Sequence, residues 1–162
     1  MNSWPDVYIP KIDARFPLPA LHLFNTSSRS VEVLPLKKRY RMYVCGITPY
    51  DATHLGHAAT YLTFDLINRY LRATGAHVDF VQNITDIDDP LLERAARDGV
   101  DWKVLAQSQI DLFRADMTDL HVIPPKDYIG VVEAMPLVVA AVENLVHSKT
   151  TYELEGDLYF KV

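Results

Sequence analysis

The sequence predicts an α/β fold in which parallel strands are joined by crossover helices, with small β-hairpins added. Apolar and polar side chains alternate over residues 39–45, which is typical of a strand, and from about residue 56 apolar positions recur every three or four residues, which is typical of a helix. A second short run rich in Val and Phe follows at 77–83. A strand, a helix and a strand in this order predict a βαβ unit with parallel strands.

The segments before this unit predict an extended arm and a hairpin. Four prolines, the last of them Pro19, interrupt the first twenty residues and disfavour a helix there. Residues 21–24 and 31–34 are rich in apolar side chains and flank a polar stretch, so they predict strand, turn and strand. We therefore expect an arm over 1–20 and one domain over 21–162.

Three helices and a second hairpin are predicted after the unit. Asp88 or Asp89 can cap the first helix, and a second helix runs from Trp102 to a point before two consecutive prolines. The third helix is expected to begin near Pro136, and its apolar side is long. The chain then closes in a hairpin around a Glu-Gly turn at 155–156.

Composition limits the classes of partner. The chain has 162 residues and a formal net charge of -5, which argues against broad contact with nucleic acid or an anionic membrane. Its single cysteine cannot form an intrachain disulfide, and no apolar run is long enough for a membrane helix. We expect a cytoplasmic protein that acts on small molecules.

The stretch "YVCGITPYDATHLGH" contains most of the candidate ligand-binding residues. Ligands of parallel α/β sheets bind beyond the carboxyl ends of the strands, where Cys45 and residues 83–85 fall. His54 and His57 stand at the start of the helix, where backbone N–H groups and the helix dipole favour a phosphate. Gly56 has no side chain, so a flat ring such as adenine could approach the backbone. The segment predicts a nucleotide pocket with a thiolate beside it.

Simpler interpretations of the same residues stay open. A lone cysteine such as Cys45 is commonly a small buried hydrophobe. His54 and His57 could be two unrelated histidines, or all three side chains could bind one zinc ion.

Two further groups of residues are explained without a ligand. The acidic cluster Asp86, Asp88 and Asp89 resembles a metal site, but helix capping explains it. Trp102 and Phe113 stand at helical spacing, which predicts core positions.

The motif "YVCG-x-T-x-YD-x-x-HLGHA", followed by "NITDIDD", resembles the cysteinyl-tRNA synthetases, class I synthetases with a Rossmann-type catalytic domain. The resemblance runs from about residue 21 to residue 162. Three departures make the chain more similar to a related family, the ATP-dependent cysteine ligases of mycothiol biosynthesis. These are "ITPYD" after Cys-Gly where the synthetases tend to have Pro-Thr-Val-Tyr-Asp, Ala59 in place of an arginine, and Pro90 in place of a lysine. The early pair "SW" also resembles the ligases.

The resemblance implies a reaction in two steps. The carboxylate of L-cysteine attacks the α-phosphate of ATP, which gives cysteinyl-adenylate and pyrophosphate, and the amine of glucosaminyl-inositol then forms an amide and releases AMP. It also implies that Cys45 is a zinc ligand and that magnesium accompanies ATP. In the ATP site, it implies that His54 and His57 contact the phosphates and that Gly56 lies under adenine. The residues that the resemblance places around the cysteinyl-adenylate are Gly46, Ile47, Thr48, Thr60, Asn83, Ile84 and Thr85.

Members of both families are longer than this chain. The sequence contains no KMSKS-type loop and no second cysteine, so we expect the N-terminal half of a catalytic domain that binds zinc poorly and is inactive alone. The full-length protein is expected to be a monomer that binds no nucleic acid. The alternatives are an N-terminal fragment of a cysteinyl-tRNA synthetase and a non-catalytic module that binds an adenylate.

Overall fold

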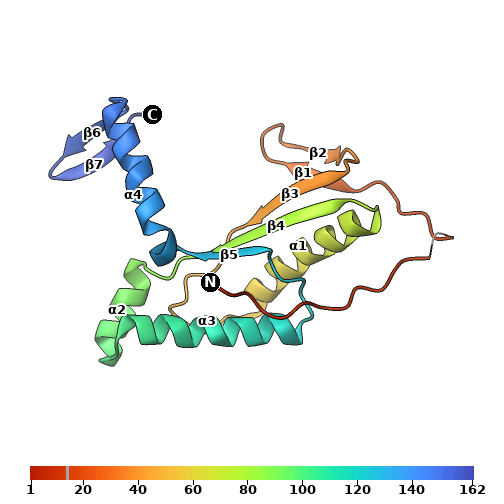
Figure 1. Cartoon of the computed structure of the whole chain (residues 1–162), viewed down its shortest axis with the longest axis horizontal. Coiled ribbons are helices and arrows are strands. Elements are labelled where there is room, and N and C mark those ends of the chain that lie inside the picture. The colour runs from red at the N-terminus through yellow and green to blue at the C-terminus, as the bar shows by residue number, and fades with distance from the viewer. Residues whose placement is uncertain (14) are drawn as a thin grey trace.

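The computed structural model describes residues 1–13 and 15–162, and Figure 1 shows their arrangement. The elements in chain order are β1 (His22–Asn25), β2 (Ser30–Val33), β3 (Arg39–Val44), α1 (Leu55–Ala73), β4 (His77–Ile84), α2 (Asp89–Asp98), α3 (Trp102–Asp119), β5 (Asp127–Gly130), α4 (Val131–His147), β6 (Thr151–Leu154) and β7 (Asp157–Phe160). No helix within the described ranges is both long and apolar enough to cross a membrane.

A parallel sheet with the strand order β3-β4-β5 forms the centre of the fold. β3 and β4 pair from Arg39 opposite His77 to Val44 opposite Gln82, with α1 as the crossover between them. This confirms the predicted βαβ unit. The third strand, β5, was not predicted, and it pairs in parallel with the carboxyl half of β4. The hairpins β1–β2 and β6–β7 are antiparallel, as expected.

Helices α1 and α3 lie on the same side of the sheet (Figure 1). The core between them contains Tyr61 of α1 and Phe113 of α3, whose rings meet edge to face at 5.1 Å. Phe113 is fully buried, which confirms its predicted core position, and Trp102 packs against a second small cluster beside α2. Side chains on the other face of the sheet, such as Arg41 and Tyr43, are exposed.

The first residues of the chain contribute to this core, although residues 1–13 and 15–20 form no helix or strand. Trp4 is 4% exposed, and its indole nitrogen donates to the carbonyl oxygen of Val122 at 2.8 Å. Its ring meets Phe113 and Tyr128 edge to face. The indole therefore ties the amino-terminal arm to α3 and β5.

The acidic residues after β4 cap helices. Asp88 is the N-cap of α2, and its carboxylate accepts from the backbone N–H of Asp89. Asp86 is buried, and its Oδ1 accepts from the N–H of Val132 in the first turn of α4 at 2.9 Å. Capping is thus confirmed for Asp86 and Asp88, and each carboxylate serves a different helix.

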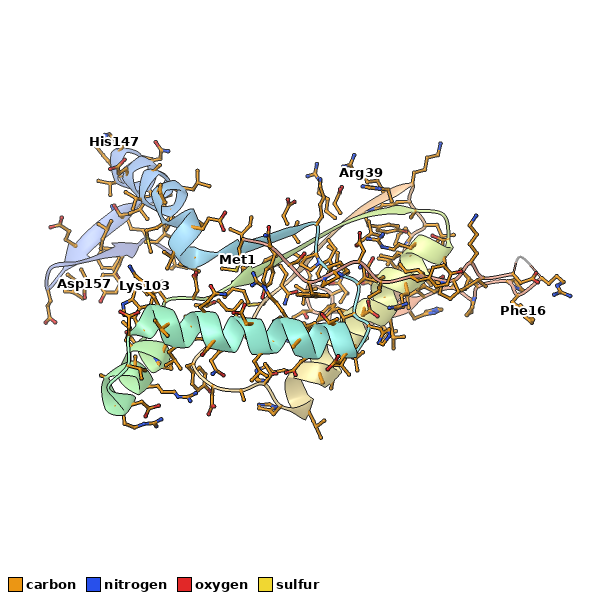
Figure 2. All side chains as sticks on the ribbon, turned by 60° about the horizontal axis from the view of Figure 1, so that its bottom comes forward. Met1, Phe16, Arg39, Lys103, His147 and Asp157 are labelled. Carbon is orange, nitrogen blue, oxygen red and sulfur yellow. The ribbon has the colours of Figure 1, made fainter. Side chains whose placement is uncertain are left out.

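Helix α4 begins at Val131, so the prediction of a start near Pro136 is wrong. Pro136 lies inside the helix. The turn that precedes it is the amino end of α4, which the carboxylate of Asp86 and the acidic side chain of Glu133 stabilise. All residues of α4 are at least partly exposed. Figure 2 shows α4 and the final hairpin, marked by His147 and Asp157, projecting away from the helices below the sheet.

Candidate functional site

The carboxyl ends of β3 and β4 come into direct contact just after β3. A Cβ atom on Gly46 would stand 1.6 Å from the carbonyl oxygen of Asn83, so only glycine fits there. The N–H of Gly46 donates to Oδ1 of Asn83 at 2.9 Å, and the N–H of Thr85 donates to the carbonyl of Ile47 at 3.0 Å. Two segments that are distant in the sequence, 45–47 and 83–85, therefore form one edge.

His54 and His57 form a reciprocal cap at the amino end of α1. Nδ1 of His54 accepts from the N–H of Gly56 at 3.0 Å, and Nδ1 of His57 accepts from the N–H of His54 at 3.2 Å. The two ring centroids are 4.2 Å apart, so they are not unrelated histidines. Because both Nδ1 atoms accept, the hydrogen of each neutral ring is on Nε2.

The electrostatics favour the neutral form of His57. Burial, and then the neighbouring His54, lower the pKa of His57 below its ordinary value. The N–H of Gly56 donates to Nδ1 of His54, so this backbone donor is not free to bind a ligand. The Nε2–H groups of the two imidazoles are donors that can bind a ligand in its place. The pair can thus present two Nε2–H groups beside the positive end of the α1 dipole.

A pocket of about 270 Å³ opens between this cap and the β3–α1 turn. Five of the predicted site residues line it, namely Gly46, Ile47, Thr48, His54 and His57. Its outer loop is held by Arg94 of α2, which donates to the carbonyl of Tyr50 and to the carboxylate of Asp51. Sequence reasoning missed Arg94, because no motif marks its contact with this loop.

The other predicted site residues do not line this pocket. Thr60 is exposed on α1 and donates to the carbonyl of Gly56 at 3.0 Å. Asn83 and Thr85 are half-buried beside Gly46. The side chain of Ile84 is fully buried in the hydrophobic core, so it does not reach a ligand.

Cys45 follows β3 directly, and its thiol is free and exposed. The interpretation as a buried hydrophobe is therefore wrong. Its carbonyl accepts from the hydroxyl of Tyr61 at 3.3 Å, and burial, followed by the proximity of Cys45, raises the pKa of Tyr61 to about 12.

A complete metal site is not formed by this part of the protein. Over residues 1–13 and 15–162, no group of three or more His, Cys, Asp or Glu side chains is placed to hold a metal ion. The alternative in which Cys45, His54 and His57 bind one zinc ion is therefore wrong. Cys45 fits zinc as one soft thiolate ligand, and the described residues do not complete a tetrahedral set.

Tyr43 is a second residue that sequence reasoning missed. Its hydroxyl donates to Oδ1 of Asn83 at 2.8 Å, on the face of the sheet opposite the core. Partial desolvation, and then the nearby thiol of Cys45, raise the pKa of Tyr43. The alternation in β3 places this residue on the exposed face, but the contact depends on the register with β4.

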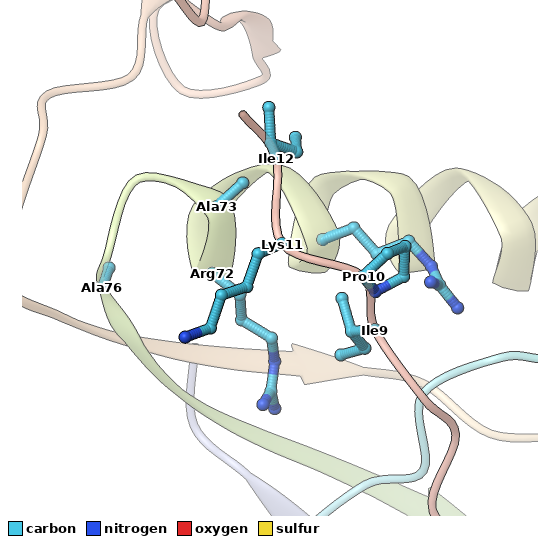
Figure 3. Close-up of a pocket in the computed structure, with 8 residues that line it drawn as sticks. Ile9, Pro10, Lys11, Ile12, Arg72, Ala73 and Ala76 are labelled. Carbon is cyan, nitrogen blue, oxygen red and sulfur yellow. The ribbon is translucent and has the colours of Figure 1, made fainter. Parts of the chain in front are cut away.

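A larger cavity, of about 650 Å³, lies between the amino-terminal arm and the end of α1 (Figure 3). Lys11 of the arm and Arg72 of α1 border it, together with Ile9 and Ile12. None of the predicted site residues contributes to its lining.

Comparison with known proteins shows which family has this arrangement. Residues 32–162 match the family of tRNA synthetases class I (C), catalytic domain. The chain is 57% identical over 160 residues to an L-cysteine:1D-myo-inositol 2-amino-2-deoxy-alpha-D-glucopyranoside ligase 2 of Corynebacterium jeikeium (strain K411), covering 98% of this chain and 38% of the relative. It is 55% identical over 161 residues to the corresponding ligase of Renibacterium salmoninarum, covering 99% of this chain and 38% of the relative.

Solved structures agree on the fold. A Mycobacterium tuberculosis methionyl-tRNA synthetase in complex with methionyl-adenylate superposes with a TM-score of 0.63 and 24% identity, covering 72% of this chain and 23% of the synthetase. The fold is thus that of a class I synthetase catalytic domain. The chain spans less than half the length of the curated relatives described above.

Proposed function

We propose that this chain, which belongs to the family of class I (C) tRNA synthetase catalytic domains, is part of an ATP-dependent ligase that joins L-cysteine to glucosaminyl-inositol. The main support is the 57% identity, over nearly the whole chain, to a relative named as a ligase of these substrates. The proposed substrates are small molecules, and the proposed location is the cytoplasm. We expect no nucleic-acid partner.

The proposed chemistry has two steps. A carboxylate oxygen of cysteine attacks the α-phosphorus of ATP, the bond to the bridging oxygen breaks, and pyrophosphate leaves. The amine of glucosaminyl-inositol then attacks the acyl carbon, loses a proton, and displaces AMP to leave an amide. Both steps develop negative charge on oxygen, which fixed hydrogen-bond donors stabilise most effectively.

The histidine pair supplies such donors in the proposed reaction. The Nδ1 atoms of His54 and His57 accept backbone hydrogen bonds, so each neutral ring keeps an Nε2–H group that can donate to a ligand. These donors, with the positive end of α1, would bind phosphate oxygens of ATP and the charge of the transition state. Magnesium would accompany ATP as part of the substrate.

Cys45 is proposed as one zinc ligand, because its thiol is exposed at the same sheet edge. Zinc, when bound, would select the thiol of substrate cysteine over the hydroxyl of serine, since thiolate is the softer ligand. The chain supplies only this one cysteine, so we expect residues 1–162 alone to bind zinc weakly and to show little activity.

The test uses the complete gene product with ATP, L-cysteine and glucosaminyl-inositol, and measures the amide and AMP by mass spectrometry. We expect His57→Ala to slow cysteine-dependent ATP–pyrophosphate exchange by about 100-fold. The matched control is His22→Ala, because His22 is exposed on β1, and it should leave the rate unchanged. Transfer of cysteine to tRNA without amide formation would contradict the proposal and favour a cysteinyl-tRNA synthetase.

A further inference from the structure

The side-chain amide of Asn83 is held in one orientation by two donors. The N–H of Gly46 lies 2.9 Å from Oδ1, and the hydroxyl of Tyr43 lies 2.8 Å from the same atom. A backbone N–H can only donate, so the amide oxygen must face β3 and the hydroxyl must donate as well. Nδ2 then faces Thr85, whose Oγ1 is 3.4 Å away.

The parallel register explains why Tyr43 reaches this amide. Tyr43 stands opposite Val81, and Asn83 is two residues further along β4, so Tyr43 and Asn83 are diagonal neighbours on one face. The Tyr43 residue is 64% exposed, and its ring takes no part in the core between the sheet and its helices. Core packing therefore gives no reason for a tyrosine here, whereas the hydrogen bond at the sheet edge does.

The amide nitrogen of Asn83 carries two hydrogens, and Thr85 takes one of them. Across residues 1–13 and 15–162, the structure gives no protein acceptor for the second. We infer that Tyr43 is a positioning residue: it fixes the Asn83 amide so that Nδ2 donates to an acceptor oxygen of the bound ligand. The ligand class is an aminoacyl-adenylate, which offers carbonyl and phosphate oxygens. This choice of ligand rests on the proposed function, whereas the orientation of the amide does not.

The first test needs no ligand. In ¹⁵N-labelled protein, Tyr43→Phe should accelerate solvent exchange of the Asn83 side-chain amide protons roughly three- to tenfold, because one hydrogen bond to this amide is lost. Tyr8→Phe is the matched control, since Tyr8 is 88% exposed and distant from this edge in sequence. An unchanged exchange rate in Tyr43→Phe, with the melting temperature also unchanged, would overturn the positioning role.

The second test measures binding of cysteinyl-sulfamoyl-adenosine, a non-reactive analogue of cysteinyl-adenylate, to the complete gene product by calorimetry. We expect Tyr43→Phe to raise Kd roughly three- to tenfold, and Tyr8→Phe to leave it unchanged. Asn83→Asp keeps the acceptor oxygen and removes the donor, so it should weaken binding at least as much.

The two tests fail in different ways. If the wild-type protein does not bind the analogue, the proposed function is wrong, and the exchange rates alone decide the role of Tyr43. If Tyr43→Phe and Asn83→Asp bind the analogue as the wild-type protein does, the inferred donor to the ligand is wrong, and the proposed function is unaffected.

Discussion

Replacement of Gly46 by alanine should weaken the contact between the two strands that form the site. The added Cβ would stand 1.6 Å from the carbonyl oxygen of Asn83 and 2.7 Å from its carbon, so β3 and β4 must move apart. The hydrogen bonds at risk are the 2.9 Å bond from Gly46 to Asn83 and the 3.0 Å bond from Thr85 to Ile47. At about 0.5–1.5 kcal/mol each, their loss lowers the free energy of unfolding by about 1–3 kcal/mol.

Urea unfolding followed by circular dichroism measures this loss, with Gly56→Ala as the matched control. A Cβ on Gly56 would meet only the ring of His54, at 2.8 Å, and a side chain can turn away. A turned ring loses the hydrogen bond from the N–H of Gly56, but alanine favours a helix over glycine by about 0.8–1.0 kcal/mol and offsets that loss, so Gly56→Ala should leave the stability nearly unchanged. Unfolding of Gly46→Ala at the same urea concentration as the wild-type protein, or an equal loss of stability in Gly56→Ala, would show that the contact between Gly46 and Asn83 does not require glycine.

Three other predictions concern groups outside this contact. In an NMR titration, His57 should have a pKa below 6.5, and a pKa above 6.5 would contradict this. The free energy of unfolding should then fall as the pH drops below about 6.5, because the unfolded chain binds the proton at a higher pH than the folded protein does. Trp4→Ala should lower the free energy of unfolding by about 3–5 kcal/mol in urea, since the indole is buried; a loss below about 1 kcal/mol would show that the arm is not part of the core. Asp86→Ala should remove the cap of α4 and cost about 1 kcal/mol by the same measurement, and an unchanged midpoint would disprove the cap.

Much of the central βαβ unit could be predicted from the sequence because its pattern is local. Alternation of side chains identified β3, and a repeat of three to four residues identified α1. β5 has only four residues, with Asp127 and Gly130 at its ends, so it offers too little alternation to identify a strand. Its extended conformation depends on pairing with β4, which no local pattern reveals.

The candidate site was predictable only in part. The motif indicated that His54 and His57 act together, and their rings, 4.2 Å apart, agree with this, whereas Cys45 does not line the pocket beside them. The reciprocal cap was not predictable, because it depends on ring orientation. The contact between Tyr43 and Asn83 was missed for a similar reason, since it spans two strands and depends on their register.

The start of the chain and the segment after α3 are joined by the indole of Trp4, which donates to Val122 across 118 positions of sequence. During synthesis the first residues leave the ribosome long before Phe113 and Tyr128 exist to receive that ring. The nascent chain must therefore carry an exposed indole until more than three quarters of these 162 residues are made. Closure of so long a loop is slow, so this docking step is expected to come late in folding.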